Sequence, residues 1–313
     1  MSCLSHERQN WAVCSLSLLG GALLALACGP TQLAPAAMPT EQPASHEASA
    51  VTTGSGSLDA LRRQLSSGLS GASELELAAR GFGPALGQLL AESPSLSTLT
   101  FLEVSDNELG SRGVGALARS PNLQRVRELG LGGNDIDDEG VEMLARATAF
   151  PDLETLNLSG NAITARGLAL LLGASPPRLN SLDLSMNAIG DAGASALARG
   201  KSSFKSLYLL GCEIGPEGAQ ALARSTHLGM LEVLALAGNA VGDDGAEQLA
   251  QSSALPALTT LDLCANAIGE RGALALAQST RFKHLKVLEL FGNEIGSRGT
   301  AALRKRFGKG LHI

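Results

Sequence analysis

Residues 129–145 read LGLGGNDIDDEGVEMLA, and residues 156–172 read LNLSGNAITARGLALLL. The two stretches place Leu, Leu, Asn, Ile and Gly at the same relative positions, offset by 27 residues. A fixed offset of this length predicts that each stretch folds as a copy of one structural unit. These copies decide the fold.

The same pattern continues in both directions from these two copies, with successive copies 25 to 27 residues apart. Leu stands five residues before the marker position, which is Asn in all copies but one: Asn107, Asn134, Asn161, Asn187, Cys212, Asn239, Asn266 and Asn293. Gly stands six residues after it in every copy: Gly113, Gly140, Gly167, Gly193, Gly218, Gly245, Gly272 and Gly299.

Each column has a physical reading. The alternation around the two Leu positions predicts a short strand whose Leu side chains point into the core. The Asn amide can bond backbone groups where the strand ends. A helix follows, and the polar residue four after the marker is expected to be its N-cap. These expected caps are Ser111, Asp138, Asp191, Asp243 and Ser297. The Gly column is expected to let helix and sheet approach closely.

The unit L-x-x-L-x-L-x-x-N-x-I-G-x-x-G-x-x-x-L-A resembles the leucine-rich repeat, within it the ribonuclease-inhibitor-like class, over residues 72–303. The resemblance implies an α/β solenoid shaped as a horseshoe, with a parallel sheet on the concave face and helices on the convex face. We expect a repeat domain over residues 58–313. It comprises an N-terminal cap (58–98), eight repeats (about 99–303) and a C-terminal cap (304–313), since end repeats lack a neighbour.

The composition agrees with such a fold. The chain is 44% hydrophobic but only 3% aromatic, so Leu, Ile, Val and Ala must fill its core. The formal net charge of −6 argues against a nucleic-acid partner, since nucleic-acid binders normally carry a basic face.

The first residues read as a signal for export. Ala12–Ala27 is an uncharged stretch of 16 residues, short for a membrane-spanning helix and typical of a signal peptide, so we expect a signal peptide over residues 1–27. Leu24-Ala25-Leu26-Ala27-Cys28 resembles a bacterial lipobox, although Ala25 and Leu26 depart from its usual order of residues. The resemblance implies lipidation of Cys28; a secreted or periplasmic protein with an incidental Cys28 is the alternative. Residues 28–57 are rich in Pro, Ala, Ser, Thr and Gly and predict a flexible tether, so that lipid would be the only link to a membrane.

The sequence predicts no enzyme, cofactor or metal site. The histidines are His6, His46, His227, His284 and His312, and none is expected to share a repeat column with a Cys, Ser or carboxylate. The Gly residues follow the repeat rather than a phosphate-binding loop. Cys212 and Cys264 stand two repeats apart, about 10 Å and too far for a disulfide, so both are expected to be thiols.

Candidate binding residues come from the columns that alternate with the strand Leu positions and so face the concave side. These columns hold carboxylates, no Lys or Arg, and a few large apolar groups. The predicted partner-binding residues are Glu76, Phe101, Glu103, Glu128, Asp183, Tyr208, Leu210, Asp262, Glu289 and Phe291.

Such a face predicts a non-enzymatic module that binds a protein or peptide of basic character through electrostatic and apolar contacts. Two alternatives stay open: an inhibitor or regulator of a secreted or envelope enzyme, and an envelope scaffold.

Overall fold

The computed structural model describes residues 50–52, 56–69, 71–174 and 177–313. The predicted signal peptide and Cys28 lie outside these residues. Over the described ranges, eleven strands form a single parallel sheet in sequence order. The strands are β1 (Ala50–Thr52), β2 (Glu74–Glu76), β3 (Phe101–Glu103), β4 (Glu128–Gly130), β5 (Thr155–Asn157), β6 (Ser181–Asp183), β7 (Ser206–Tyr208), β8 (Val233–Ala235), β9 (Thr260–Asp262), β10 (Val287–Glu289) and β11 (Leu311–His312).

One helix precedes the first repeat and one follows each of the strands β2 to β10. The helices are α2 (Leu58–Ser67), α3 (Pro84–Ala91), α4 (Gly110–Ala118), α5 (Asp138–Ala145), α6 (Ala165–Ala174), α7 (Gly190–Arg199), α8 (Pro216–Ala223), α9 (Gly242–Gln251), α10 (Glu270–Gln278) and α11 (Gly296–Phe307). Short 3-10 turns, η1 (Pro94–Leu96) and η2 (Gly308–Gly310), complete the chain.

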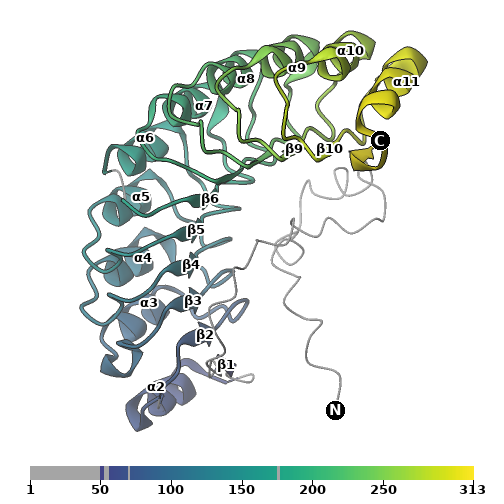
Figure 1. Cartoon of the computed structure of the whole chain (residues 1–313). Helices are drawn as coiled ribbons and strands as arrows, with labels where there is room; N and C mark the ends of the chain where they lie inside the picture. The colour runs from purple at the N-terminus through teal and green to yellow at the C-terminus, as the bar shows by residue number, and fades with distance from the viewer. Residues whose placement is uncertain (1–49, 53–55, 70, 175–176) are drawn as a thin grey trace, which may run out of the picture.

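Figure 1 shows the strands along the inside of an arc and the helices along its outside. The curvature follows from spacing, because packed helices need about 8–10 Å between axes while paired strands need about 4.8 Å. The predicted α/β solenoid, with its sheet on the concave face, is confirmed.

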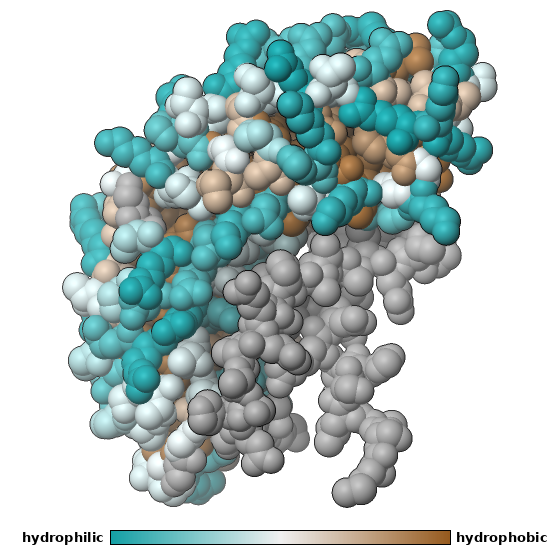
Figure 2. All heavy atoms as spheres, in the orientation of Figure 1, coloured by the Kyte–Doolittle hydropathy of each residue, from teal (hydrophilic) through white to brown (hydrophobic). Residues whose placement is uncertain are grey.

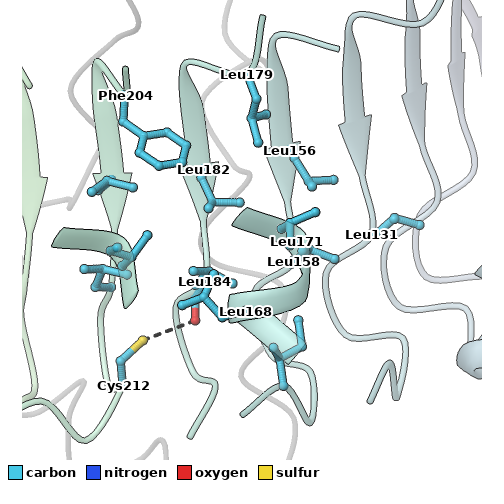
Figure 3. Packing of buried hydrophobic residues seen from close by; sticks show 14 of the residues in the cluster. Leu131, Leu156, Leu158, Leu168, Leu171, Leu179, Leu182, Leu184, Phe204 and Cys212 are labelled. Carbon is cyan, nitrogen blue, oxygen red and sulfur yellow. Dashed lines mark hydrogen bonds between the residues drawn. The ribbon is translucent and has the colours of Figure 1, made fainter. Parts of the chain in front are cut away.

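The core is a layer of Leu between sheet and helices. Figure 3 shows Leu156 and Leu158 on one side of this layer and Leu168 and Leu171 of α6 on the other. All four are buried, and burying one Leu contributes roughly 1.5–3 kcal/mol. Phe204 is wholly buried in the same layer, at the point where the chain enters β7.

The Asn column forms a hydrogen-bonded ladder, as predicted. The Asn134 amide donates to the carbonyls of Val104 and Gly132 at 3.0 and 3.1 Å. Its oxygen accepts the backbone N–H groups of Asn107 and Leu109 at 3.0 and 3.2 Å. Each such side chain therefore ties its own turn to the turn of the preceding repeat.

Cys212 occupies one rung of this ladder with fewer bonds. Its thiol donates to the Leu184 carbonyl, with Sγ 3.2 Å from the oxygen, as Figure 3 shows. A thiol offers no strong acceptor, and the Ile189 N–H turns instead to the carbonyl of Asn187. Burial raises the pKa of the Cys212 thiol to about 12. The thiol is therefore protonated and structural, as the sequence predicted.

The acidic residues near the helix starts correct the expected capping. Asp191 lies inside α7, and its Oδ1 accepts the N–H groups of Gly215 and Gly218, at the start of the next helix, α8. Asp243 of α9 bonds the start of α10 in the same way. The helices begin earlier than expected, so these side chains cap the following repeat rather than their own.

The Gly column also acts differently from the prediction. A Cβ on Gly245 would lie 2.6 Å from the Val241 side chain, 3.0 Å from Cβ of Ala219 and 3.4 Å from Cα of Pro216. Ala219 and Pro216 belong to α8, the neighbouring helix. The Gly residues therefore allow close approach between successive helices, not between helix and sheet.

The structure departs from the sequence prediction at the N-terminal end of the solenoid and agrees with it at the C-terminal end. Residues 50–52 lie in the range expected to be a flexible tether, yet they pair in parallel with β2 as the first strand of the sheet. At the other end, the expected C-terminal cap (304–313) consists of the end of helix α11, the turn η2 and the short strand β11, which pairs with β10.

Candidate functional site

The concave face is built from the first and third residues of each three-residue strand. The middle residue, such as Leu102 or Leu207, is completely buried in the core. Its neighbours point to the opposite side, because side chains alternate along a strand. The candidate residues in strands β2 to β10 therefore lie on one face, as the column analysis predicted, and Leu210 and Phe291 follow two positions after their strands.

The candidate carboxylates differ in their access to solvent. Glu76 and Glu128 are exposed, whereas Asp183 and Glu289 are half-buried. Glu103 and Asp262 are only 6% and 9% exposed. The two exposed carboxylates can meet a partner without rearrangement, so they are the strongest of the acidic candidates.

Three of the carboxylates also have a local structural role. Each accepts the backbone N–H two residues further on, where the strand ends. The bonds are Glu103 to Ser105 at 2.6 Å, Asp183 to Ser185 at 2.8 Å, and Asp262 to Cys264 at 2.9 Å. Asn157 makes the same bond to Ser159, so a neutral amide serves equally well at this position. The charge at Glu103, Asp183 and Asp262 is therefore not required by the fold.

Burial governs the ionisation of these groups. It raises the pKa of Glu103, Asp183 and Asp262, and the backbone N–H bonds offset only part of the rise. Although the Glu128 side chain is exposed, neighbouring atoms exclude part of the water around its carboxylate, and this desolvation is the main cause that raises its pKa. Repulsion from Glu74 and Glu154 raises it further. Strands β2 to β4 and the residue before β5 thus carry neighbouring carboxylates, which we call the acidic region: Glu74, Glu76, Glu103, Glu128 and Glu154.

The large apolar candidates do not form one patch. Phe101 on β3 stands four strands from Tyr208 on β7, and Phe291 stands just after β10, three strands further. At about 4.8 Å per strand these separations are about 19 and 14 Å. Only Tyr208 and Leu210 are close in sequence, and Tyr208 pairs in register with Asp183.

Basic residues lie just outside the columns that the sequence analysis considered. Arg127, Lys205 and Lys286 directly precede strands β4, β7 and β10 and are exposed. Arg127 pairs with Glu154, its Nη1 lying 3.6 Å from a carboxylate oxygen. The outer side of the arc over the helices is mainly hydrophilic in Figure 2. These residues share one position of the repeat, directly before the strand, so aligning the repeats in the sequence could have identified them.

The structure brings together a group of residues at the C-terminal end of the face that the sequence analysis did not connect. Ligand atoms of Asp262, Cys264 and Glu289 all lie within 4.8 Å of one another. Nδ1 of His312 lies 3.4 Å from Oε1 of Glu289. The expectation that no histidine shares a column with a carboxylate is wrong for His312, because β11 places it in register with Glu289.

The prediction was wrong because fewer residues separate the last two strands than separate the strands of the repeats. His312 follows Glu289 by 23 residues, whereas the repeats advance by 25 to 27. The chain closes the solenoid through α11 and the 3-10 turn η2 rather than through a full repeat. A search at a fixed period therefore passes over His312.

Comparison with known families and structures agrees with this architecture. The leucine-rich repeat family model matches residues 95–118, 123–145, 151–172, 177–198, 200–223, 227–250 and 283–303. The chain belongs to the leucine-rich repeat family. The repeat that carries Asp262 and Cys264 lies between two matched segments.

A crystal structure of a Bacteroides fragilis protein matches with a TM-score of 0.53 at 15% identity, covering 85% of this chain and 74% of that one. The crystal structure of a TLR13–ssRNA13 complex matches with a TM-score of 0.38 at 17% identity, covering 78% of this chain and 32% of that one. The likeness to the Bacteroides fragilis protein is one of fold. No curated protein sequence matches the chain.

Within the described ranges, none of the helices combines the length and the apolar character that crossing a bilayer requires.

Proposed function

We propose that this protein is an exported, lipid-anchored binding module that holds a basic segment of a protein partner on its concave face. Leucine-rich repeats suggest a protein-binding module, and family members typically bind rather than catalyse. We also infer that the repeats are of the ribonuclease-inhibitor-like class, which their 25- to 27-residue length and the helix in each repeat support.

The observation that carries the proposal is the acidic region over β2 to β5. The pKa of Glu128 is raised chiefly by loss of water around its carboxylate and further by repulsion from Glu74 and Glu154. Arg127 pairs with Glu154 from outside the concave columns, but these columns, which hold the other four carboxylates of the acidic region, contain no Lys or Arg. A cationic side chain from a partner supplies the missing charge and also speeds association through long-range attraction.

The apolar groups supply a second kind of contact. Tyr208 and Leu210 lie together in the middle of the face and are half-buried, so each keeps part of its surface for a partner. Aromatic side chains are enriched among residues that dominate binding energy. A partner with a basic segment toward β2 and an apolar side chain over β7 fits this arrangement.

Export and anchoring rest on the sequence of residues 1–57. The uncharged stretch Ala12–Ala27 and the following Cys28 support cleavage and lipidation, and a lipid anchor needs two or more chains for stable attachment. Mass spectrometry of the mature N-terminus tests this part. An acylated Cys28 is expected; an unmodified Cys28 indicates a secreted protein, and an intact Met1 rules out cleavage.

Selection of peptides tests the binding part. A random peptide library displayed on phage is panned on the purified repeat protein at low ionic strength. We expect the recovered peptides to be rich in Lys and Arg and to be released as salt is raised. Recovered peptides that are neutral or acidic, with affinity independent of salt, contradict the proposal.

A further inference from the structure

Three metal-binding side chains, Asp262, Cys264 and Glu289, converge at the C-terminal end of the concave face, and His312 contacts Glu289 beside them. Asp262, Glu289 and His312 occupy one register position on the adjacent strands β9, β10 and β11. Their backbones are therefore spaced at about 4.8 Å. Cys264 follows Asp262 by two residues and points to the same side. Figure 1 shows β9 and β10 beside the C-terminal end of the chain.

The distances suit a small ion. The ligand atoms of Asp262, Cys264 and Glu289 lie within 4.8 Å of one another, and Glu289 Oε1 lies 3.4 Å from His312 Nδ1. Tetrahedral zinc with bonds of about 2.0–2.3 Å separates its ligand atoms by about 3.3–3.6 Å. The Glu289–His312 pair already has this separation. The ligand atoms of Asp262, Cys264 and Glu289 need to approach one another by up to about 1 Å. His312 has to turn from its contact with Glu289 toward Asp262 and Cys264.

The local bond at Asp262 leaves one of its carboxylate oxygens for an ion. Asp262 uses Oδ1 to accept the N–H of Cys264, at 2.9 Å. This bond fixes the orientation of the carboxylate, and its second oxygen can bind an ion. Orientation of a ligand by a backbone group is common in metal sites and increases metal affinity.

The combination of donors selects the kind of metal. A thiol and an imidazole disfavour calcium and magnesium, which prefer oxygen ligands alone. Zinc accepts sulfur, nitrogen and carboxylate oxygen in four-coordinate sites. Two carboxylates on neighbouring strands repel each other, and a divalent cation between them removes that repulsion.

We propose that Asp262, Cys264, Glu289 and His312 bind a single zinc ion on the concave face. On binding, the Cys264 thiol releases its proton to solvent and bonds the ion as a thiolate. His312 binds as the neutral imidazole through Nδ1, and the two carboxylates bind through one oxygen each. The ion would join strands β9 to β11 and, because one thiol proton is released, would change the net charge of the four side chains from about −2 to about −1.

Cobalt is a suitable probe because a thiolate bound to Co²⁺ gives a charge-transfer absorption in the near ultraviolet. The full chain is treated with a chelator, dialysed and titrated with Co²⁺. We expect this band to saturate at one equivalent and to disappear when Zn²⁺ is added. Absence of the band in the wild-type chain overturns the proposal.

Matched variants assign the ligands. Cys264→Ser is expected to abolish the band, whereas Cys212→Ser, which changes the other buried thiol of the repeats, is expected to keep it. His312→Gln changes an exposed residue near the C-terminus, so the fold is retained, and it is expected to weaken cobalt binding at least about tenfold. Circular dichroism of each variant confirms folding. A band that persists in Cys264→Ser, or unchanged affinity in His312→Gln, overturns the assignment.

Discussion

Replacing Asn134 by Ala tests whether the Asn ladder holds successive repeats together. Asn134 is completely buried, and its side chain bonds four buried backbone groups. It accepts from the N–H groups of Asn107 and Leu109 and donates to the carbonyls of Val104 and Gly132. Ala keeps the backbone but removes all four bonds.

The expected cost follows from the groups left without a partner. A buried donor or acceptor that loses its bond costs about 1–3 kcal/mol. The two N–H groups alone therefore give about 2–6 kcal/mol, and the carbonyls add to this. The matched control is Cys212→Ala at the equivalent position of another repeat. It removes the weak thiol bonds to the carbonyls of Leu184 and Leu210 and a small buried volume, for about 1–2 kcal/mol.

Urea unfolding followed by far-ultraviolet circular dichroism measures both variants. We expect Asn134→Ala to lower the free energy of unfolding by at least about 2 kcal/mol more than Cys212→Ala does. The slope of the transition must be compared, since long repeat arrays can unfold in parts. Equal losses in the two variants would refute the role given to the ladder.

Three further changes test other parts of the structure by the same urea assay. Asp243→Ala removes the cap on the next helix and is expected to destabilise by about 1 kcal/mol; no loss would contradict capping between repeats. Met186 has a left-handed backbone (φ 58°) and is 46% exposed, so Met186→Gly relieves backbone strain and removes few contacts. We expect this change to raise the free energy of unfolding by about 0.5–1 kcal/mol and the control Met186→Ala to give no such gain. Glu103→Gln tests the raised pKa of that carboxyl. Because a raised carboxyl pKa means that the folded state binds the proton more tightly, the wild type is expected to gain stability relative to this variant as the pH falls from neutral toward 4.5; parallel pH profiles would contradict this.

The fold could be predicted because the same physical requirements recur in every repeat. A Leu position, an apolar position and an Asn at fixed spacing define strand, core and turn without any long-range information. The polar residues near the helix starts show the limit of this reasoning. Asp191 has the chemistry of an N-cap, but the helix that it serves is decided by the distance between neighbouring repeats. That distance is a property of the stacked helices.

A second ladder illustrates the same limit. The hydroxyl of Ser225 donates to the Ala198 carbonyl at 2.7 Å, and Ser252 and Ser279 bond carbonyls in the preceding repeat in the same way. These Ser residues recur 13 positions after the marker position, so aligning the repeats shows that Ser is repeated there. Its meaning depends on which carbonyl lies nearby, and that follows only from the packing of adjacent helix ends.

The candidate face was predicted in part. The alternation of side chains correctly assigned its columns, because it depends only on the strand. Exposure was not predictable: Glu103 lies beside Gly130, so closely that a Cβ on that Gly would collide with the carboxylate, and Glu103 is buried while Glu128 is exposed. His312 was missed because the chain reaches β11 by a shorter path than a full repeat.

Affinity for a selected Lys- and Arg-rich peptide tests the proposed function most directly. The double variant Glu76→Lys/Glu128→Lys reverses two exposed charges of the acidic region. The control Glu139→Lys/Glu217→Lys makes the same change in charge at exposed positions of helices α5 and α8.

One exposed ion pair contributes about 0.2–1 kcal/mol, and reversal replaces attraction by repulsion. Two reversals therefore cost about 0.8–4 kcal/mol. Fluorescence anisotropy at low salt is expected to show affinity reduced at least about fourfold by the concave variant and nearly unchanged by the convex one. Equal affinities for the two variants would contradict binding at the concave face.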